Sequence, residues 1–203
     1  MKLLISNIKN EKAILKNSEY ENILSKSELE RVRKFSSQKR KNEFILGRIL
    51  LRAYLSKKLR KEEKDININV AKNGAILILE TLNNKQLFAS ISHSNDYVVV
   101  AIDYFPLGID IEFKKERKDF FKLSKVAFND KNLIYKIKDE KDLEKIKDYF
   151  YNAWTKKEAL YKLESTLKNY KNDFSSSYKI KFINKKLIND FSFTISKASP
   201  CMK

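Results

Sequence analysis

The sequence is poor in glycine, cysteine and histidine, and each shortage excludes a class of site. With 3 Gly in 203 residues, the chain lacks the glycine-rich loops that hold phosphates in P-loop and dinucleotide-binding proteins. The single cysteine, Cys201, cannot form an internal disulfide and has no partners at zinc-site spacing, which favours a reducing compartment. The single histidine, His93, excludes a histidine-rich metal site.

Long apolar runs are also missing. No segment approaches the roughly 20 apolar residues that cross a bilayer, and residues 1–10 lack the order of a secretory signal. From the sequence we therefore expect a cytoplasmic protein that has no membrane partner.

Positive charge is what the chain has in excess. Its 43 Lys and Arg against 26 Asp and Glu give a formal net charge of +17. This excess predicts an anionic partner, which is a nucleic acid, a membrane surface, a phosphorylated ligand or an acidic protein. The basic residues are spread along the whole chain, however, so a general compositional bias explains the charge equally well.

The hydrophobic pattern changes period along the chain and predicts an α+β protein. Helical spacing predicts helices over residues 18–35, 37–59, 120–128, 133–137 and 143–163. Alternation and turn residues predict strands over residues 2–8, 66–70, 75–79, 87–92, 97–103, 107–112, 178–183 and 187–195. Helices followed by strands occur twice, so we predict two pseudo-symmetric halves, residues 1–105 and 106–203, packed into one functional unit.

The first motif that can carry chemistry is GIDIE, residues 108–112. Alternation along a strand places Asp110 and Glu112 on one face, while the isoleucines beside them enter the core. Two adjacent carboxylates repel each other, and a cation between them, with oxygen ligands and no thiol, indicates Mg²⁺ or Mn²⁺. The alternative is an exposed acidic pair that the following Lys114 or Lys115 neutralises.

The second motif is WTKKEALYK, residues 154–162, in the long predicted helix. Trp154, Glu158 and Lys162 are four residues apart and share one helix face. A carboxylate between an aromatic ring and an ammonium group is a candidate reactive group. The alternative is an ordinary surface ion pair, which stabilises a helix by only about 0.2–0.5 kcal/mol.

The third motif is ISHS, residues 91–94, where a predicted strand gives way to a turn. His93 can donate a hydrogen bond to a phosphate beside the hydroxyls of Ser92 and Ser94. A histidine with a purely structural role is the alternative.

Taken together and in their order along the chain, the three motifs resemble the signature of the Sfp-like 4′-phosphopantetheinyl transferases. Residues 44–52, FILGRILLR, also resemble the helix in the first half of that family, so the likeness extends from about residue 30 to residue 165. The resemblance implies two pseudo-symmetric α+β halves, with coenzyme A and a metal ion in the cleft between them. It also implies transfer of the phosphopantetheine arm of coenzyme A to a serine of an apo acyl or peptidyl carrier protein, with release of adenosine 3′,5′-bisphosphate.

The resemblance assigns roles by position. Asp110, Glu112 and Glu158 would hold Mg²⁺ against the pyrophosphate of coenzyme A, with Mn²⁺ as a substitute. Glu158 would also accept the proton of the acceptor serine, directly or through a water, with Lys162 beside it as the second catalytic residue. The residues expected to bind coenzyme A are Ser92, His93, Arg31, Arg48 and Lys162.

The basic side chains of the first half are expected to receive the ribose phosphate and to attract an acidic carrier protein. They are Arg31, Arg33, Lys34, Lys39, Arg40, Arg48 and Arg52. With such partners, neither a nucleic acid nor a membrane is expected to bind.

The chain departs from the family pattern in places. Residues 74–76 read Gly-Ala-Ile where the family often has Gly-Lys-Pro, so the phosphate-binding lysine is missing. Glu28, Glu43 and Phe44 stand where the family more often has residues suited to phosphate or adenosine. Relatives usually continue into another strand after the position of Ile195, so the second half is expected to be trimmed.

Two other functions remain open from the sequence. Asp110, Glu112 and Lys114 also fit the acid followed by Glu-x-Lys that many metal-dependent nucleases use, and a basic surface suits DNA. A non-catalytic module could instead bind nucleic acid or a carrier domain by charge alone, in which case its binding would be salt-sensitive and unaffected by Asp110→Ala.

Overall fold

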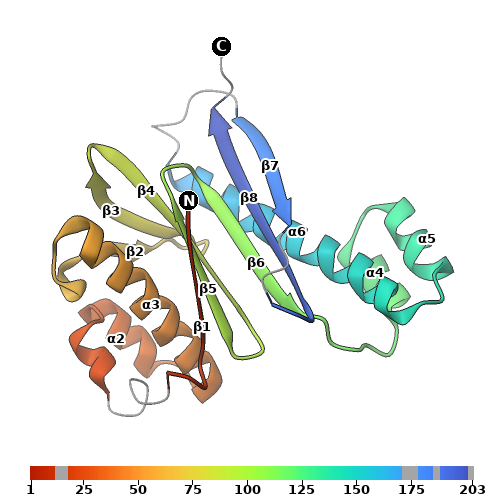
Figure 1. The fold of residues 1–203 in the computed structure, drawn as a ribbon, viewed down its shortest axis with the longest axis horizontal. Helices are drawn as coiled ribbons and strands as arrows, with labels where there is room; N and C mark the ends of the chain where they lie inside the picture. Colours follow the sequence, from red (N-terminus) through yellow and green to blue (C-terminus); the bar gives the residue numbers. More distant parts are fainter. Residues whose placement is uncertain (12–17, 171–177, 185–187, 201–203) are drawn as a thin grey trace.

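The predicted α+β class is confirmed by a computed structural model, which describes residues 1–11, 18–170, 178–184 and 188–200 (Figure 1). Cys201 lies outside the described residues. The helical elements are η1 (Glu19–Asn22), α2 (Lys26–Arg33), α3 (Gln38–Leu59), η2 (Glu63–Asp65), α4 (Phe120–Ala127), α5 (Lys131–Asp139) and α6 (Leu143–Asn169). The strands are β1 (Lys2–Asn7), β2 (Ile68–Val70), β3 (Ile76–Leu82), β4 (Lys85–Ser94), β5 (Tyr97–Asp103), β6 (Leu107–Phe113), β7 (Tyr178–Asn184) and β8 (Phe191–Pro200).

The first half is a five-stranded antiparallel sheet with helix α3 packed on it and α2 packed against α3. The strand order is β1-β5-β4-β3-β2. Leu51 and Leu55 of α3 are fully buried and pack in one cluster with Ile78 of β3 and Val100 of β5. The apolar face of α3 therefore packs on one face of the sheet, as Figure 1 shows.

The second half is a three-stranded antiparallel sheet, β6-β8-β7, with α6 packed on it. Helices α4 and α5 lie beside the N-terminal part of α6, at the end of the molecule farthest from the first half (Figure 1). Ile109 and Ile111 of β6 are fully buried on one face of the strand, and Gly108 and Asp110 are buried on the other. This confirms the prediction of a strand that is covered on both faces.

The two halves share one plan. Each begins with a strand, continues through helices that include a long one, and then returns through antiparallel strands, four in the first half and two in the second, the last of which pairs antiparallel with the first strand. That pairing joins β1 to β5 in the first half and β6 to β8 in the second. The division at residues 105 and 106 stays a prediction.

Several predicted elements were wrong in their bounds; α6, for example, extends to Asn169, beyond the predicted end at residue 163. The helix predicted over residues 18–35 is split into η1 and α2, because Ser25 forms a capping box with Glu28 and starts a new helix there. The strand predicted over residues 187–195 is β8, which begins at Phe191; Leu187 lies outside the described residues.

Helix α6 lies directly against β6 at Gly108. A Cβ atom at this position would be 2.1 Å from the carbonyl oxygen of Ala159 and 2.5 Å from the backbone nitrogen of Leu163. Only glycine therefore allows this approach, which sets the depth at which α6 is seated. Within the described residues, every helix is too short or too polar to cross a membrane.

Candidate active site

The two halves meet along β4 and β6, where side-chain hydroxyls take the place of a strand partner. Strand β6 pairs with β8 along one edge. At its other edge, alternate backbone N–H groups donate to the hydroxyls of three alternating β4 serines at 3.1, 3.3 and 3.1 Å. The donor and acceptor pairs are Ile109 with Ser90, Ile111 with Ser92, and Phe113 with Ser94. Ser90 was missed by the sequence analysis, although serines two residues apart on a strand were the available signal.

Two of these serines also hold the carboxylates of the GIDIE motif. The Ser92 hydroxyl donates to Asp110 Oδ1 at 2.8 Å, and the Ser94 hydroxyl donates to Glu112 Oε2 at 2.9 Å. The strand alternation that placed both carboxylates on one face of β6 thus directs them toward the ISHS motif of β4. Two motifs that lie 18 residues apart in sequence form one polar surface between the halves.

Lys162 of α6 brings the third motif to the same place. Its Nζ donates to Asp110 Oδ1 at 2.8 Å and to the carbonyl oxygen of Ile109 at 2.9 Å. A surface ion pair between Glu158 and Lys162 was therefore the wrong alternative, since the lysine pairs across the junction instead. Glu158 has no hydrogen-bond or ion-pair partner among the described residues.

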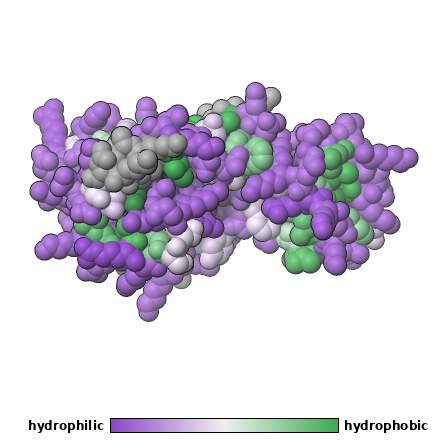
Figure 2. Space-filling view, turned by 90° about the horizontal axis from the view of Figure 1, so that it is seen from below, coloured by the Kyte–Doolittle hydropathy of each residue, from purple (hydrophilic) through white to green (hydrophobic). Residues whose placement is uncertain are grey.

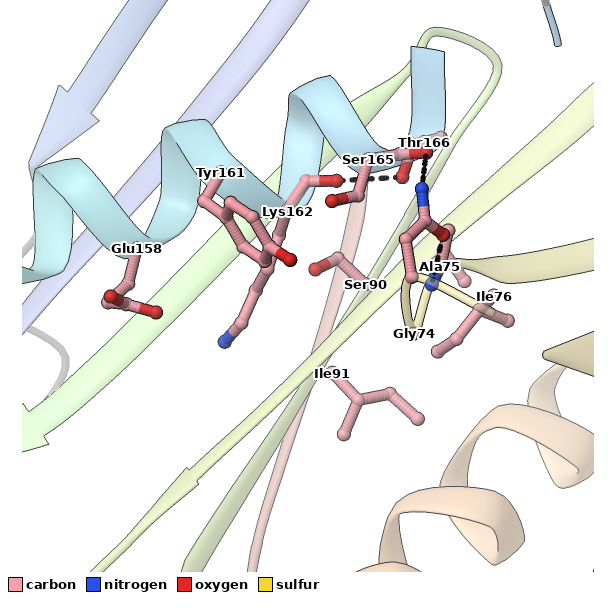
Figure 3. A pocket seen from close by; sticks show the side chains of 12 residues that line it. Gly74, Ala75, Ile76, Ser90, Ile91, Glu158, Tyr161, Lys162, Ser165 and Thr166 are labelled. Atoms are coloured by element: carbon pink, nitrogen blue, oxygen red, sulfur yellow. Dashed lines mark hydrogen bonds between the residues drawn. The ribbon is translucent and has the colours of Figure 1, made fainter. Parts of the chain in front are cut away.

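A cavity of about 210 Å³ lies between the halves at this point. Glu158, Tyr161 and Lys162 extend from one side of α6 along it, as Figure 3 shows. The opposite wall comes from the β2–β3 turn and from β4. The wall residues there are Asn73, Gly74, Ala75, Ile76, Ala89, Ser90 and Ile91.

The chemistry of Asp110 and Glu112 fits a hard divalent cation. Asp110 is 5% exposed, and its Oδ2 atom is buried with no hydrogen-bond partner among the described residues. Burial raises the pKa of Glu112, the neighbouring Asp110 adds to this, and the Ser94 hydroxyl opposes it. A cation bound by both carboxylates would stabilise their ionised forms, and oxygen ligands suit Mg²⁺.

The third predicted metal ligand is not gathered with the other two. Within the part of the chain that the structure describes, no group of three His, Cys, Asp or Glu side chains is placed to hold a metal ion. Glu158 as a ligand beside Asp110 and Glu112 therefore stays a prediction.

The lysine that the nuclease interpretation requires points elsewhere. Lys114 follows the end of β6 and its ammonium group pairs with Asp148 of α6. It neutralises neither Asp110 nor Glu112, whereas the charge of Lys115 opposes the raised pKa of Glu112. Because Asp110 is buried, the exposed acidic pair was also the wrong alternative. The nuclease interpretation has no support in this arrangement.

A second cavity, of about 420 Å³, adjoins the first, because Gly74, Ile76 and Ile91 line both. We call it the arginine cavity. Its charged and polar lining consists of Arg31, Arg40, Arg48, Glu43 and His93. The structure thus brings Arg31, Arg48 and His93 of the predicted ligand-binding residues to one cavity, whereas Ser92 lies at the junction with Asp110.

Arg48 is the buried arginine of this lining. Its Nε lies 3.5 Å from Glu28 Oε1, while its Nη1 has no hydrogen-bond partner among the described residues. Burial lowers the pKa of Arg48 to about 10, and the Glu28 carboxylate opposes this. Arg52 is fully buried and donates to the same carboxylate at 2.7 Å, so its predicted contact with a ligand was wrong.

His93 borders the same cavity in its neutral form. Burial and the cations Arg40 and Lys162 lower its pKa to about 4. Its Nδ1 lies 3.3 Å from Glu43 Oε2, and Arg40 Nη1 lies 3.1 Å from its Nε2. This arrangement suits the tautomer that carries the proton on Nδ1, which leaves Nε2 to accept from Arg40.

Comparison with known proteins identifies the family of the chain. A family model described as 4′-phosphopantetheinyl transferase, N-terminal, matches residues 16–104. A second, described as 4′-phosphopantetheinyl transferase superfamily, matches residues 106–196. The chain belongs to this superfamily. The matched ranges include every motif of the junction and the arginine cavity beside it.

Curated relatives in the 4′-phosphopantetheinyl transferase superfamily cover most of the chain. The 4′-phosphopantetheinyl transferase Sfp of Bacillus subtilis (strain 168) is 31% identical over 73% of this chain and 63% of its own length. The 4′-phosphopantetheinyl transferase ffp of Bacillus subtilis is 32% identical over 70% of this chain and 60% of its own. The chain therefore spans less than two thirds of the length of these relatives.

Solved structures of the superfamily overlap with half of the chain. A holo-(acyl-carrier-protein) synthase from Bacillus anthracis str. Ames, in complex with CoA (3′,5′-ADP), is 21% identical with a TM-score of 0.42 and covers 49% of this chain and 90% of its own. The Helicobacter pylori holo-[acyl-carrier-protein] synthase in complex with coenzyme A is 26% identical with a TM-score of 0.38. The match covers 49% of this chain and 95% of that protein. The family assignment rests on the sequence comparisons.

Proposed function

We propose that this chain transfers the 4′-phosphopantetheine arm of coenzyme A to a serine of an apo acyl or peptidyl carrier protein, with Mg²⁺ as the metal. The observation that carries the proposal is the contact of Lys162 Nζ with Asp110 Oδ1 at 2.8 Å, beside Ser92. It joins the three motifs at one point of the junction, and the family assignment supports the reaction type.

Coenzyme A would lie across the two adjoining cavities. Its pyrophosphate would lie at the junction, where Lys162 supplies a positive charge and Asp110 and Glu112 would hold the metal. Its nucleotide end would lie in the arginine cavity, with Arg31, Arg48 and His93 around it. When bound, Mg²⁺ supplies charge neutralisation and orientation for the pyrophosphate.

The reaction breaks one phosphorus–oxygen bond and forms another. The serine hydroxyl oxygen of the carrier attacks the phosphorus that bears the pantetheine arm, and adenosine 3′,5′-bisphosphate leaves. The serine proton must pass to a base within reach of the hydroxyl. Glu158 suits this role, because it lines the cavity and its carboxylate is engaged by no other described residue.

The acceptor would approach from the other side of Glu112. A third cavity, of about 440 Å³, runs outward from this residue beside α4. It combines apolar Leu123, Val126 and Trp154 with basic Arg117 and Lys157. Figure 2 shows hydrophobic patches at this end of the molecule, and others over the first half, on a largely hydrophilic face. Apolar surface beside basic residues suits a carrier helix with an apolar anchor and an acidic rim.

The test is the intact mass of an apo acyl carrier protein after incubation with this protein, coenzyme A and Mg²⁺. The expected result is a gain of one phosphopantetheine arm, which is lost on addition of EDTA and in Glu158→Gln. Exposed Glu164→Gln on the same helix serves as the matched control and should retain the gain. If several apo carriers gain no mass with the folded protein, the proposal fails.

A further inference from the structure

The arginine cavity contains a carboxylate that a phosphate site would not be expected to hold. Glu43 of α3 is 4% exposed and lines the cavity among its cations. Its Oε2 lies 3.3 Å from Arg40 Nη1 and 3.3 Å from His93 Nδ1. Burial raises the pKa of Glu43, and the Arg40 and Lys39 cations oppose this.

Glu43 offsets much of the positive charge that the cavity presents. His93 is neutral near pH 7, because its pKa is lowered to about 4. Arg40 and Glu43 form an ion pair with no net charge. The two groups nearest to Glu43 therefore add little attraction for a phosphate.

The remaining arginines are only partly available. Arg48 and Arg52 share the single carboxylate of Glu28, so one charge of this buried group is offset as well. Arg31 is exposed, with its guanidinium over the ring of Phe44 at 5.3 Å, and it has no carboxylate partner among the described residues. The arginines that remain can attract the phosphate of a nucleotide. The Glu43 carboxylate, however, repels a second phosphate that enters the cavity.

We propose that Glu43 is a specificity-determining residue that weakens the hold of this cavity on the 3′-phosphate, so that the protein accepts dephospho-coenzyme A nearly as well as coenzyme A. This inference rests on the proposed function, because that function places the nucleotide end of the donor in the arginine cavity. A 3′-hydroxyl can donate to the Glu43 carboxylate, whereas a 3′-phosphate is repelled by it.

The test compares the binding of adenosine 3′,5′-bisphosphate and AMP to the full chain by calorimetry. In the wild type we expect the bisphosphate to bind less than about tenfold more tightly than AMP. Glu43→Gln keeps the shape of the side chain and removes its charge, which should raise this ratio about tenfold, the effect of one unit charge several Å away in a partly buried site. Exposed Glu30→Gln on α2 makes the same change in net charge and should leave the ratio as in the wild type.

A second variant changes the charge balance in the opposite direction. Arg40→Gln leaves Glu43 without its ion-pair partner and should lower the ratio below that of the wild type. A wild-type ratio above about 100-fold, an unchanged ratio in both variants, or no binding of either nucleotide would each overturn the inference.

Kinetics with the two donors separates this inference from the proposed function. We expect kcat/KM for dephospho-coenzyme A to lie within about tenfold of that for coenzyme A, and Glu43→Gln to widen the gap mainly through KM. If neither donor supports transfer but the nucleotide ratios respond as stated, the proposed function fails and the role of Glu43 in binding stands. If both donors support transfer and Glu43→Gln leaves their ratio unchanged, the role of Glu43 is overturned and the transfer function stands.

Discussion

Replacing Gly108 by alanine tests the close seating of α6 on β6. The added Cβ would be 2.1 Å from the carbonyl oxygen of Ala159 and 2.5 Å from the backbone nitrogen of Leu163. Both contacts are backbone atoms of a helix, which cannot rotate away as a side chain does. The helix must therefore move by about 1 Å to reach ordinary contact distance.

The expected loss in the free energy of unfolding follows from the displacement of α6. Inserting a methyl group into a packed core costs about 1–3 kcal/mol, and a contact with helix backbone belongs at the upper end of this range. A loss of about 3 kcal/mol in a chain of this size corresponds to a fall in Tm of roughly 6–12 °C. Glu158 and Lys162 move with the helix, so we also expect transfer to fall about 100-fold, as for a 1 Å misplacement of reacting groups.

Urea denaturation and the carrier-mass assay, both performed well below the Tm of the variant, measure the two effects. Gly47→Ala on α3 is the matched control. Its Cβ would meet the ends of the Ile91 and Val98 side chains at 3.0 to 3.5 Å, which can adjust. A Gly→Ala exchange inside a helix also raises the free energy of unfolding by up to about 1 kcal/mol. The free energy of unfolding of this variant should therefore lie within about 1 kcal/mol of the wild-type value. A Gly108→Ala variant as stable as Gly47→Ala would refute the close approach of α6.

Three further predictions concern buried polar groups. Ser90→Ala leaves the N–H of Ile109 without an acceptor and should lower the free energy of unfolding, measured by urea denaturation, by about 1–3 kcal/mol. An unchanged free energy of unfolding would mean that another acceptor is within reach of this N–H. Arg52→Met removes a cation from the buried Glu28 carboxylate and should lower the free energy of unfolding by about 3–5 kcal/mol. The double variant with Glu28→Gln should recover part of this loss. If the effects of the two substitutions simply add, the two side chains are not directly coupled. For His93, the unfolded chain binds a proton below about pH 6.5, while the folded imidazole stays neutral down to about 4. The free energy of unfolding should therefore fall as the pH decreases between these values, and it should fall less in His93→Gln; equal slopes in denaturation experiments across this range would contradict the lowered pKa.

Much of the candidate site could be predicted from local spacing. The period of two in residues 108–112 correctly placed Ile109 and Ile111 in the core, where both are fully buried, and turned Asp110 and Glu112 to a common side. The helical period likewise placed Glu158 and Lys162 on the same wall of one cavity. Both outcomes depend only on backbone geometry within a single element, and the sequence carries that information directly.

The ion pairs could not be predicted in this way. One alternative paired Lys162 with Glu158 in its own helix, but Lys162 pairs with Asp110, which lies 52 residues earlier. Lys114 was a candidate partner of the acidic motif, but it pairs with Asp148. A long flexible side chain reaches several groups from one backbone position, so its partner depends on which elements pack nearby.

The sequence by itself therefore determined the elements, the direction of their side chains and, through three motifs in order, the family. Only the tertiary structure decided which charges meet, that serine hydroxyls of β4 satisfy the inner edge of β6, and that Glu43 lies among the cations of the arginine cavity. The physical reason is that hydrophobic periodicity is set by neighbours along the chain. Electrostatic and hydrogen-bond partners, in contrast, are set by distances in space, and these exist only once α3, β4, β6 and α6 have packed together.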